Sequence, residues 1–170
     1  MTIDEFRINL DIGNPKDVLK ANAKKCSKGY LFVDSDDGCC YLFGKDGKEK
    51  DINELTTIDN ELFYDDKSLT KIVLPDSVKS IGKWAFGGCI RLTSIAISNS
   101  ITSIKKYAFY SCGSFTSVTI PSSITSIGDY AFVCCDKLTS LVFKGKTFEK
   151  VKAIKNYPFD IDKSIIRYEA

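Results

Sequence analysis

The sequence contains no histidine, only one tryptophan and one methionine, and four prolines in 170 residues. Without histidine, Ser-His-Asp and Cys-His catalysis are excluded and the commonest metal ligand is missing. No apolar run approaches the roughly 18 residues that a membrane-spanning helix needs. The net charge of +2 is too small for a dedicated nucleic-acid binder. These absences predict a protein that is not an enzyme, has no membrane span and does not have nucleic acid as its partner.

Signals for metals and cofactors are also missing. The seven cysteines are an odd number without C-x-x-C spacing, which argues against a disulfide framework and against a zinc site. Asp34-Ser35-Asp36-Asp37-Gly38 resembles the start of a calcium loop but lacks the later ligands. We therefore predict no metal and no cofactor. Free cysteines, and an N-terminus that has Asp4 and Glu5 in place of a long apolar run, predict a cytoplasmic protein.

What the sequence does contain is a repeat of 23 residues between positions 69 and 143. Three copies read LTKIVLPDSVKSIGKWAFGGCIR, LTSIAISNSITSIKKYAFYSCGS and FTSVTIPSSITSIGDYAFVCCDK, and LTSLVF follows them. The segment 55–63 matches the back half of a copy, which predicts a degenerate first coil. A fixed period of this length with an L-x-x-I-x-I core is typical of a solenoid, in which stacked coils share one core.

Each repeat predicts its own local structure. The L-T-S-I-x-I segment places apolar residues on one side of a short strand. A second extended segment ends at Ile81, Ile104 or Ile127, and the following Ala-Phe pair predicts a turn that closes the coil. One cysteine recurs at the same position of each copy, and such a column is typical of small buried side chains rather than ligands. Its members are Cys89, Cys112 and Cys135.

The N-terminal 50 residues carry no repeat. Residues from Thr2 to Ile12 combine a helix-capping pattern with a strand-like alternation, and we favour a helix. Asn14 and Pro15 predict the start of a second helix, which Gly29 would end. Residues 29–45 predict a β-hairpin, because aromatic and β-branched runs flank the turn-forming residues 34–38. A second turn is expected at residues 45–48.

The motif IPSSITSIGDYAF, with C-x-x-L-T-S-I before it, closely resembles the BspA-type (Treponema pallidum type) leucine-rich repeat. Copy two departs from the motif, with Ser98 for the proline and Lys105 for the glycine, which predicts a locally looser turn. The resemblance implies an α+β fold: a short leucine-rich-repeat solenoid of β-rich coils (51–143), with an N-terminal α/β cap (1–50) and a small C-terminal cap (144–170). The tail predicts a helix near residues 148–155 and an extended segment at 164–167.

The resemblance also implies a non-enzymatic module for protein–protein interaction, without naming a partner. Trp84, Tyr107 and Tyr130 share one repeat position and would stack one coil apart, with Tyr110 nearby. Aromatic anchors of this kind suit an interface, and burial under a neighbouring loop is the alternative. Lys71 and Val73 are further candidates, because they point outward from the first repeated strand. The tail has seven basic and four acidic residues, which we interpret chiefly as a solvated face.

The sequence is compatible with two more specific functions. The small size, the absent catalytic residues and a tail that resembles bacterial and phage-borne members of the family suggest an inhibitor that docks on a host enzyme or defence complex. A structural component of a tail or surface layer is the other possibility, and it would form defined oligomers. The sequence predicts neither the partner nor the oligomeric state.

Overall fold

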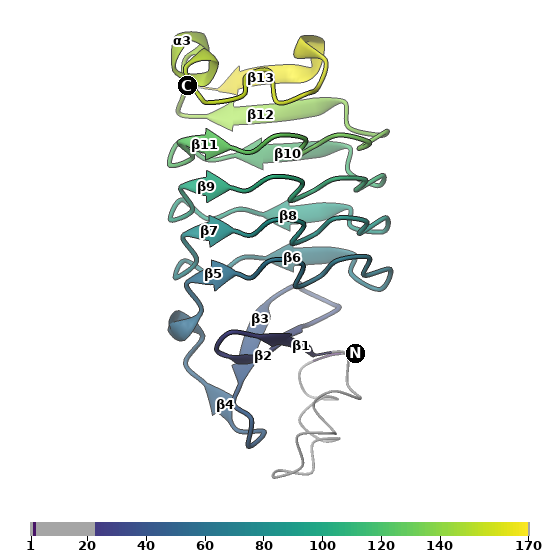
Figure 1. Ribbon diagram of the computed structural model, residues 1–170, viewed down its shortest axis with the longest axis vertical. Coiled ribbons are helices and arrows are strands. Elements are labelled where there is room, and N and C mark those ends of the chain that lie inside the picture. The colour runs from purple at the N-terminus through teal and green to yellow at the C-terminus, as the bar shows by residue number, and fades with distance from the viewer. Residues whose placement is uncertain (1, 3–22, 170) are drawn as a thin grey trace.

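The computed structural model describes residue 2 and residues 23–169, and its repeats form a solenoid of stacked coils (Figure 1). Each coil contributes one strand to each of two parallel arrays, here called the front sheet and the rear sheet. The front sheet consists of β5 (Thr57–Ile58), β7 (Ser80–Ile81), β9 (Ser103–Ile104) and β11 (Ser126–Ile127). The rear sheet consists of β6 (Lys71–Val73), β8 (Ser94–Ala96), β10 (Ser117–Ile120), β12 (Ser140–Lys144) and β13 (Ile166–Glu169). The predicted leucine-rich-repeat solenoid is thus confirmed.

The core is a column of identical residues inside the coils. Phe63, Phe86, Phe109 and Phe132 stack in parallel with ring centroids 5.2–5.4 Å apart. The degenerate first coil takes part in this column, as predicted, since β5 pairs with β7 and Leu55 and Ile58 are fully buried. Burial of such apolar surface is what stabilises each coil, and it requires the neighbouring coil on either side.

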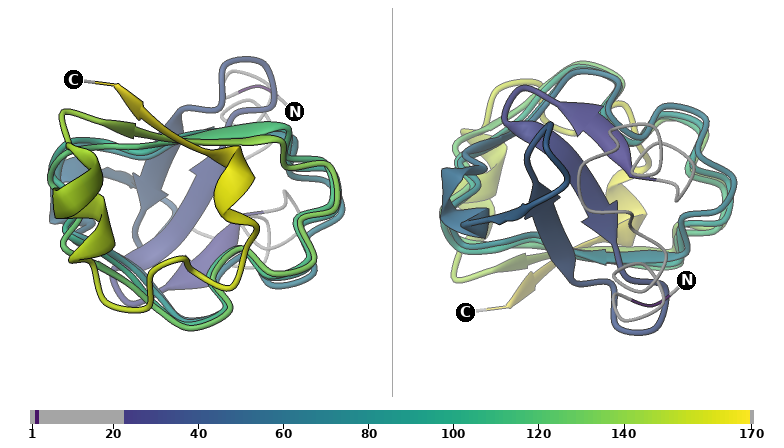
Figure 2. Two further views of the ribbon diagram at one scale, coloured as in Figure 1. Left: turned by 90° about the horizontal axis from the view of Figure 1, so that it is seen from above. Right: turned by 90° about the horizontal axis from the view of Figure 1, so that it is seen from below.

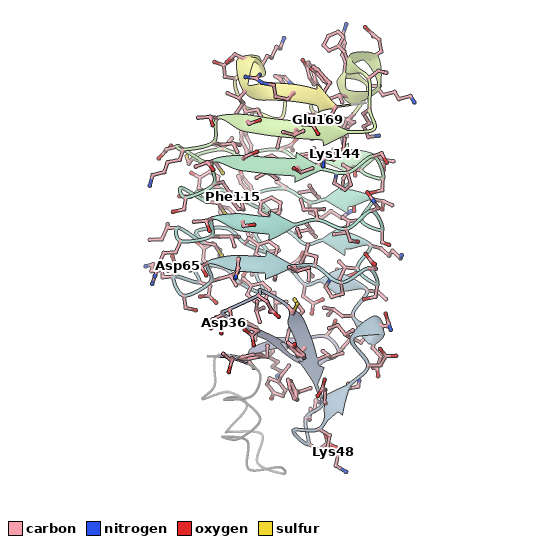
Figure 3. The ribbon with its side chains drawn as sticks, turned by 180° about the vertical axis from the view of Figure 1, so that it is seen from behind. Asp36, Lys48, Asp65, Phe115, Lys144 and Glu169 are labelled. Carbon is pink, nitrogen blue, oxygen red and sulfur yellow. The ribbon has the colours of Figure 1, made fainter. Side chains whose placement is uncertain are left out.

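The rear sheet is interrupted once. β6 pairs with β8, β10 pairs with β12 and β12 pairs with β13, but no ladder joins β8 to β10. Phe115, labelled in Figure 3, begins this strand segment where the other coils have leucine. Its ring is fully buried and packs on Phe109, with the ring centroids 5.8 Å apart. Ile97, the partner position of the buried Leu74, is only partly buried. A shallow groove lined by Ile97, Pro121 and neighbouring residues lies at this interruption. Ser98, one of the two residues for which a looser turn was predicted, directly follows Ile97. The other, Lys105, lies at the regular front sheet, where its N–H donates to the Ile81 carbonyl at 3.0 Å.

The N-terminal segment forms a four-stranded antiparallel sheet of β1 (Lys24–Cys26), β2 (Gly29–Val33), β3 (Cys40–Phe43) and β4 (Glu49–Lys50). The predicted hairpin and the turn at 45–48 are confirmed. The predicted second helix is wrong at its end, because Lys24–Cys26 is a strand paired with β2. The buried β2 needs a partner on both edges, and this requirement overrides the weak helix signal of the lysines. The remainder of that helix and the one predicted before it lie outside the described residues.

This sheet lies across the open end of the coil stack (Figure 2). Leu31 and Leu42 belong to the same core as the coils. The loop between β2 and β3 lies against β6: the Val73 N–H donates to the Gly38 carbonyl at 2.8 Å. Gly38 has φ +80°, and a Cβ there would lie 3.2 Å from the backbone of Ile72, so the position requires glycine. The hairpin therefore extends the hydrogen bonding of the rear sheet.

The tail adds another turn to the solenoid. Its helix α3 (Phe148–Lys152) begins where predicted but ends at Lys152. A bridge from Lys155 to Ser126 continues the front sheet, and β13 continues the rear sheet in parallel with β12. The predicted extended segment is shifted to Ile166–Glu169 and follows a 3-10 turn, Lys163–Ile165. Among the described residues, no helix has the length and apolar character needed to cross a membrane.

Candidate functional site

The aromatic side chains predicted as an interface do meet on the surface. We call Tyr64, Trp84, Tyr107, Tyr110 and Tyr130 the aromatic strip. Trp84 stacks on Tyr107 at 4.4 Å between centroids, and Tyr107 stacks on Tyr130 at 5.2 Å. Trp84, Tyr107 and Tyr130 each follow the end of a front-sheet strand, β7, β9 or β11, and these strands lie on the near side in Figure 1. Because Tyr107 lies between two stacked rings, both of its faces are covered and its edge is the part that can contact a partner.

Tyr110 and Tyr64 border the stack with their rings nearly perpendicular to it. Tyr110 lies 5.1 Å from Trp84 and 5.7 Å from Tyr107, and Tyr64 lies 5.6 Å from Trp84. Tyr64 was not predicted, although it occupies the repeat position of Tyr110 two coils earlier. The residue between them at that position is Gly87, where a Cβ would lie 2.5 Å from the Trp84 ring. The glycine is what allows the tryptophan to lie flat against the coil.

The backbone under the strip is strained. Trp84, Tyr107 and Tyr130 have φ of +57°, +60° and +57°. Bulky side chains rarely adopt this left-handed conformation, which costs roughly 1–2 kcal/mol for a residue other than glycine. Glu61, at the same position of the first coil, has φ of +59° and so shares the conformation without an aromatic ring. The three middle coils thus carry aromatic residues where asparagine or glycine would cost less, which is a feature typical of functional positions.

Regular hydrogen bonds hold these strained turns in register. The Phe86 N–H donates to the Ala108 carbonyl at 2.8 Å, and the Phe109 N–H donates to Ala131 at 2.9 Å. At the last coil, the side chain of Asp160 accepts from the Tyr130 N–H at 2.7 Å. The turns are therefore fixed by their neighbours, and the aromatic strip is a preformed surface.

The charge along the strip changes sign. The Lys106 ammonium lies beside the rings of Tyr107 and Tyr130, at 4.9 and 5.3 Å from their centroids, and contacts Asp129 at 3.9 Å. Lys83 and Lys105 are exposed, and neither forms a salt bridge with any residue that the structure describes. The centre of the strip is consequently basic, whereas Glu61 and Asp129 lie toward its two ends.

Lys71 and Val73, the other predicted surface residues, are not part of the strip. They belong to β6 in the rear sheet and contact the loop between β2 and β3. The Lys71 ammonium donates to the Asp36 carbonyl, and the Val73 backbone bonds to Gly38. The Val73 side chain is 42% exposed. The structure thus separates the predicted surface residues into two places.

The cysteine column is buried, as predicted from its repeat position. Each thiol donates to a phenylalanine carbonyl of the preceding coil, from Cys89 to Phe63 at 3.0 Å, from Cys112 to Phe86 at 3.1 Å and from Cys135 to Phe109 at 3.1 Å. Burial raises the pKa of Cys89 and of Cys135 to about 12, so both remain protonated. These thiols serve packing and interior hydrogen bonding. In residues 23–169, no group of histidine, cysteine or acidic side chains has the arrangement of a metal site.

A small hollow lies between the N-terminal sheet and the first coil. It is lined by Phe32, Phe63, Asp66 and Leu69 among others, with a volume of about 130 Å³. Pockets for small molecules usually have roughly 300–1,000 Å³. This hollow is too small for such a ligand, and the exposed aromatic strip is the stronger candidate for recognition.

Comparison with known proteins agrees with this geometry. The model of the BspA type leucine rich repeat region matches residues 56–167 in six copies, and so extends through the tail. No curated protein matches the chain.

Solved structures of bacterial leucine-rich repeat proteins are similar in fold. One from Bacteroides ovatus is 29% identical with a TM-score of 0.58; the match covers 68% of this chain and 28% of that one. One from Bacteroides capillosus is 23% identical with a TM-score of 0.53, and the match covers 72% of this chain and 99% of that one. The leucine-rich repeat protein of T. pallidum is 23% identical with a TM-score of 0.45, and the match covers 76% of this chain and 78% of that one.

Proposed function

We propose that this chain, which belongs to the family of BspA-type leucine-rich repeat proteins, is a non-enzymatic scaffold. It binds another protein through the aromatic strip. The observation that carries this proposal is the left-handed backbone of Trp84, Tyr107 and Tyr130. The repeat position that carries Glu61 in the first coil displays three stacked rings in the next three coils, at a conformational cost. Tyrosine and tryptophan are also the residues most enriched at binding hot spots.

The rear sheet is the alternative surface. Its outward side chains are small and neutral in the middle coils, such as Ser94, Ala96 and Thr119. Such residues rarely dominate binding energy, whereas the aromatic strip offers rigid side chains with few rotatable bonds. The rear sheet therefore serves as the comparison surface in the test.

The test is site-specific photo-crosslinking with the full-length chain. A photoreactive phenylalanine analogue replaces Tyr64, which is 54% exposed at the border of the strip, or Val73, which is 42% exposed on the rear sheet. We expect the Tyr64 position to give a discrete crosslinked protein in lysate of the source organism, and Tyr107→Ala in the same chain to abolish it. A discrete product from Val73 alone would assign binding to the rear sheet. Products from neither position would contradict the scaffold role.

The finer roles stay predictions. Docking on a host enzyme or defence complex would give a stoichiometric complex in this experiment, and a structural role would give crosslinks between copies of the chain. A cytoplasmic location is also proposed, supported by seven free cysteines of which Cys26, Cys89, Cys112 and Cys135 are buried.

A further inference from the structure

We infer that the partner of the aromatic strip presents an acidic, extended protein segment that lies across the coils of Trp84 and Tyr107. This inference rests on the proposed function and adds the chemistry of the partner. It starts from the way the rings are presented. Stacking leaves Tyr107 without a free face, so ligands that need a ring face, such as sugars or nucleic-acid bases, cannot stack there. Ring edges carry partial positive charge and attract carboxylate and carbonyl oxygens.

The charges beside these rings have the same sign as the ring edges. Lys83 directly precedes Trp84, and Lys105 and Lys106 directly precede Tyr107. The hydrogen bond from the Trp84 N–H to the Lys106 carbonyl places these two segments side by side. Lys106 is already engaged with Asp129 and with two rings, whereas Lys83 and Lys105 have no ionic partner among the described residues. Two cations without an ionic partner in residues 23–169, on a preformed surface, favour an anionic partner and accelerate its encounter.

The ends of the strip limit where such a segment can bind. Glu61 occupies the strained turn before Trp84, and Asp129 precedes Tyr130. An acidic segment that ran along the whole strip would meet both carboxylates, so the favourable path crosses the two middle coils. Nucleic acid could satisfy the lysines through its phosphates, but it would gain no base stacking on Tyr107. The observations therefore favour a protein segment.

Trp84 provides a local readout, because it is the only tryptophan of the chain. The full-length protein is titrated at low salt with poly-L-glutamate, with oligothymidylate of equal charge and with poly-L-lysine, while tryptophan emission is recorded. We expect saturable change with poly-L-glutamate, loss at high salt, weaker response to oligothymidylate and none to poly-L-lysine. The K83E/K105E variant should weaken poly-L-glutamate binding about tenfold or more.

The matched control is K150E/K152E in the basic tail, which changes the net charge equally and should leave the Trp84 response unchanged. An unresponsive Trp84 in the folded protein, equal weakening by both variants, or stronger binding of oligothymidylate would each overturn the inference. The crosslinking experiment is independent: a partner captured at Tyr64 without an acidic segment would sustain the scaffold role and reject this partner chemistry.

Discussion

The front and rear sheets are built from the same repeat but differ in regularity. The front sheet runs unbroken from β5 to β11, whereas the rear sheet has no ladder between β8 and β10. At the front, Ile81, Ile104 and Ile127 are identical and each is followed by the same Ala-Phe turn. In the rear sheet, Phe115 lies just before β10, at the repeat position where the other coils have leucine. The ladder is thus continuous where the core residues repeat, and it is interrupted where one core residue differs in size.

The first prediction disrupts the phenylalanine column of the core, which runs without interruption beside the front sheet. Phe109→Ala removes the ring that stacks on Phe86 and Phe132, both at 5.4 Å, and leaves a cavity between coils. We expect a loss of about 3–5 kcal/mol in the free energy of unfolding, measured by urea denaturation. Thr119→Ala, at an exposed site of the rear sheet, should change it by less than about 0.5 kcal/mol. A loss below about 1 kcal/mol for Phe109→Ala would show that the coils collapse around the cavity.

Much of this phenylalanine column could be predicted from the sequence. The period places Phe86, Phe109 and Phe132 in one register, and the cysteine column follows from the same count. Stacking of Trp84 on Tyr107 also follows from the period alone. The left-handed conformation of these residues does not, because periodicity gives the position of a side chain and no information about φ.

Other features cannot be predicted from the sequence because they depend on tertiary contacts. The strand Lys24–Cys26 exists because β2 needs a second neighbour, which is a tertiary requirement without a local signal. The place of Tyr64 in the aromatic strip depends on Gly87, which makes room for the neighbouring Trp84 ring. The separation of Lys71 and Val73 from the strip depends on which side of the coil each strand occupies.

The second prediction compares two residues at one strained position of the coil. Gly88 and Ser111 share a repeat position and have φ of +76° and +58°. Gly88→Ala places a Cβ at 3.3 Å from the Asp65 backbone in a conformation that disfavours side chains, and should lower stability by about 1 kcal/mol. Ser111→Gly should relieve the same strain and raise stability by up to about 1 kcal/mol. Thermal melts of both variants test this, and equal signs would refute the strain argument.

The third prediction concerns the contact between the N-terminal sheet and the first coil, next to β6. Asp66 is buried and bonds to Lys24 at 2.7 Å. Burial acts to raise the pKa of Asp66, but hydrogen bonds from Lys24 and Ser68 outweigh it, and the net pKa is lowered. The ionised carboxylate therefore contributes stability above about pH 4, the pKa of an unfolded aspartate, and this contribution is lost as the pH falls through the lowered pKa.

Lys24→Met removes the counter-charge and one hydrogen bond, so the pKa of Asp66 should be higher than in the unsubstituted protein, although the hydrogen bonds from Ser68 still oppose the effect of burial. We expect acid unfolding, followed by circular dichroism against pH, to begin at a higher pH than in the unsubstituted protein. Lys25→Met, at the exposed neighbouring position, is the control and should leave the profile unchanged. Identical profiles for the two variants would mean that the Lys24–Asp66 pair does not stabilise this contact.

The last prediction repairs the irregular rear sheet. The Thr93 N–H donates to Thr70 at 2.8 Å and the Thr139 N–H to Thr116 at 3.0 Å, but no corresponding bond joins the Thr116 N–H to Thr93 within residues 23–169. The Thr116 amide should therefore exchange its hydrogen faster than the amides of Thr93 and Thr139. Phe115→Leu restores the residue of the other coils, and combination with Ser98→Pro restores the proline of the repeat.

In this double variant, we expect slower exchange at Thr116 and a change in unfolding free energy of less than about 1.5 kcal/mol, because the loss of ring burial opposes the gain in rigidity. The measurement is residue-resolved hydrogen exchange by NMR. The amide of Thr102, which bonds to Lys79 at 2.9 Å in the regular part of the stack, should be unaffected. If Thr116 exchanges as slowly as Thr93 in the unsubstituted protein, the two sheets are equally regular in solution. If it stays fast in the double variant, neither Phe115 nor Ser98 causes the interruption, and the cause lies in how the whole coil is seated between its neighbours.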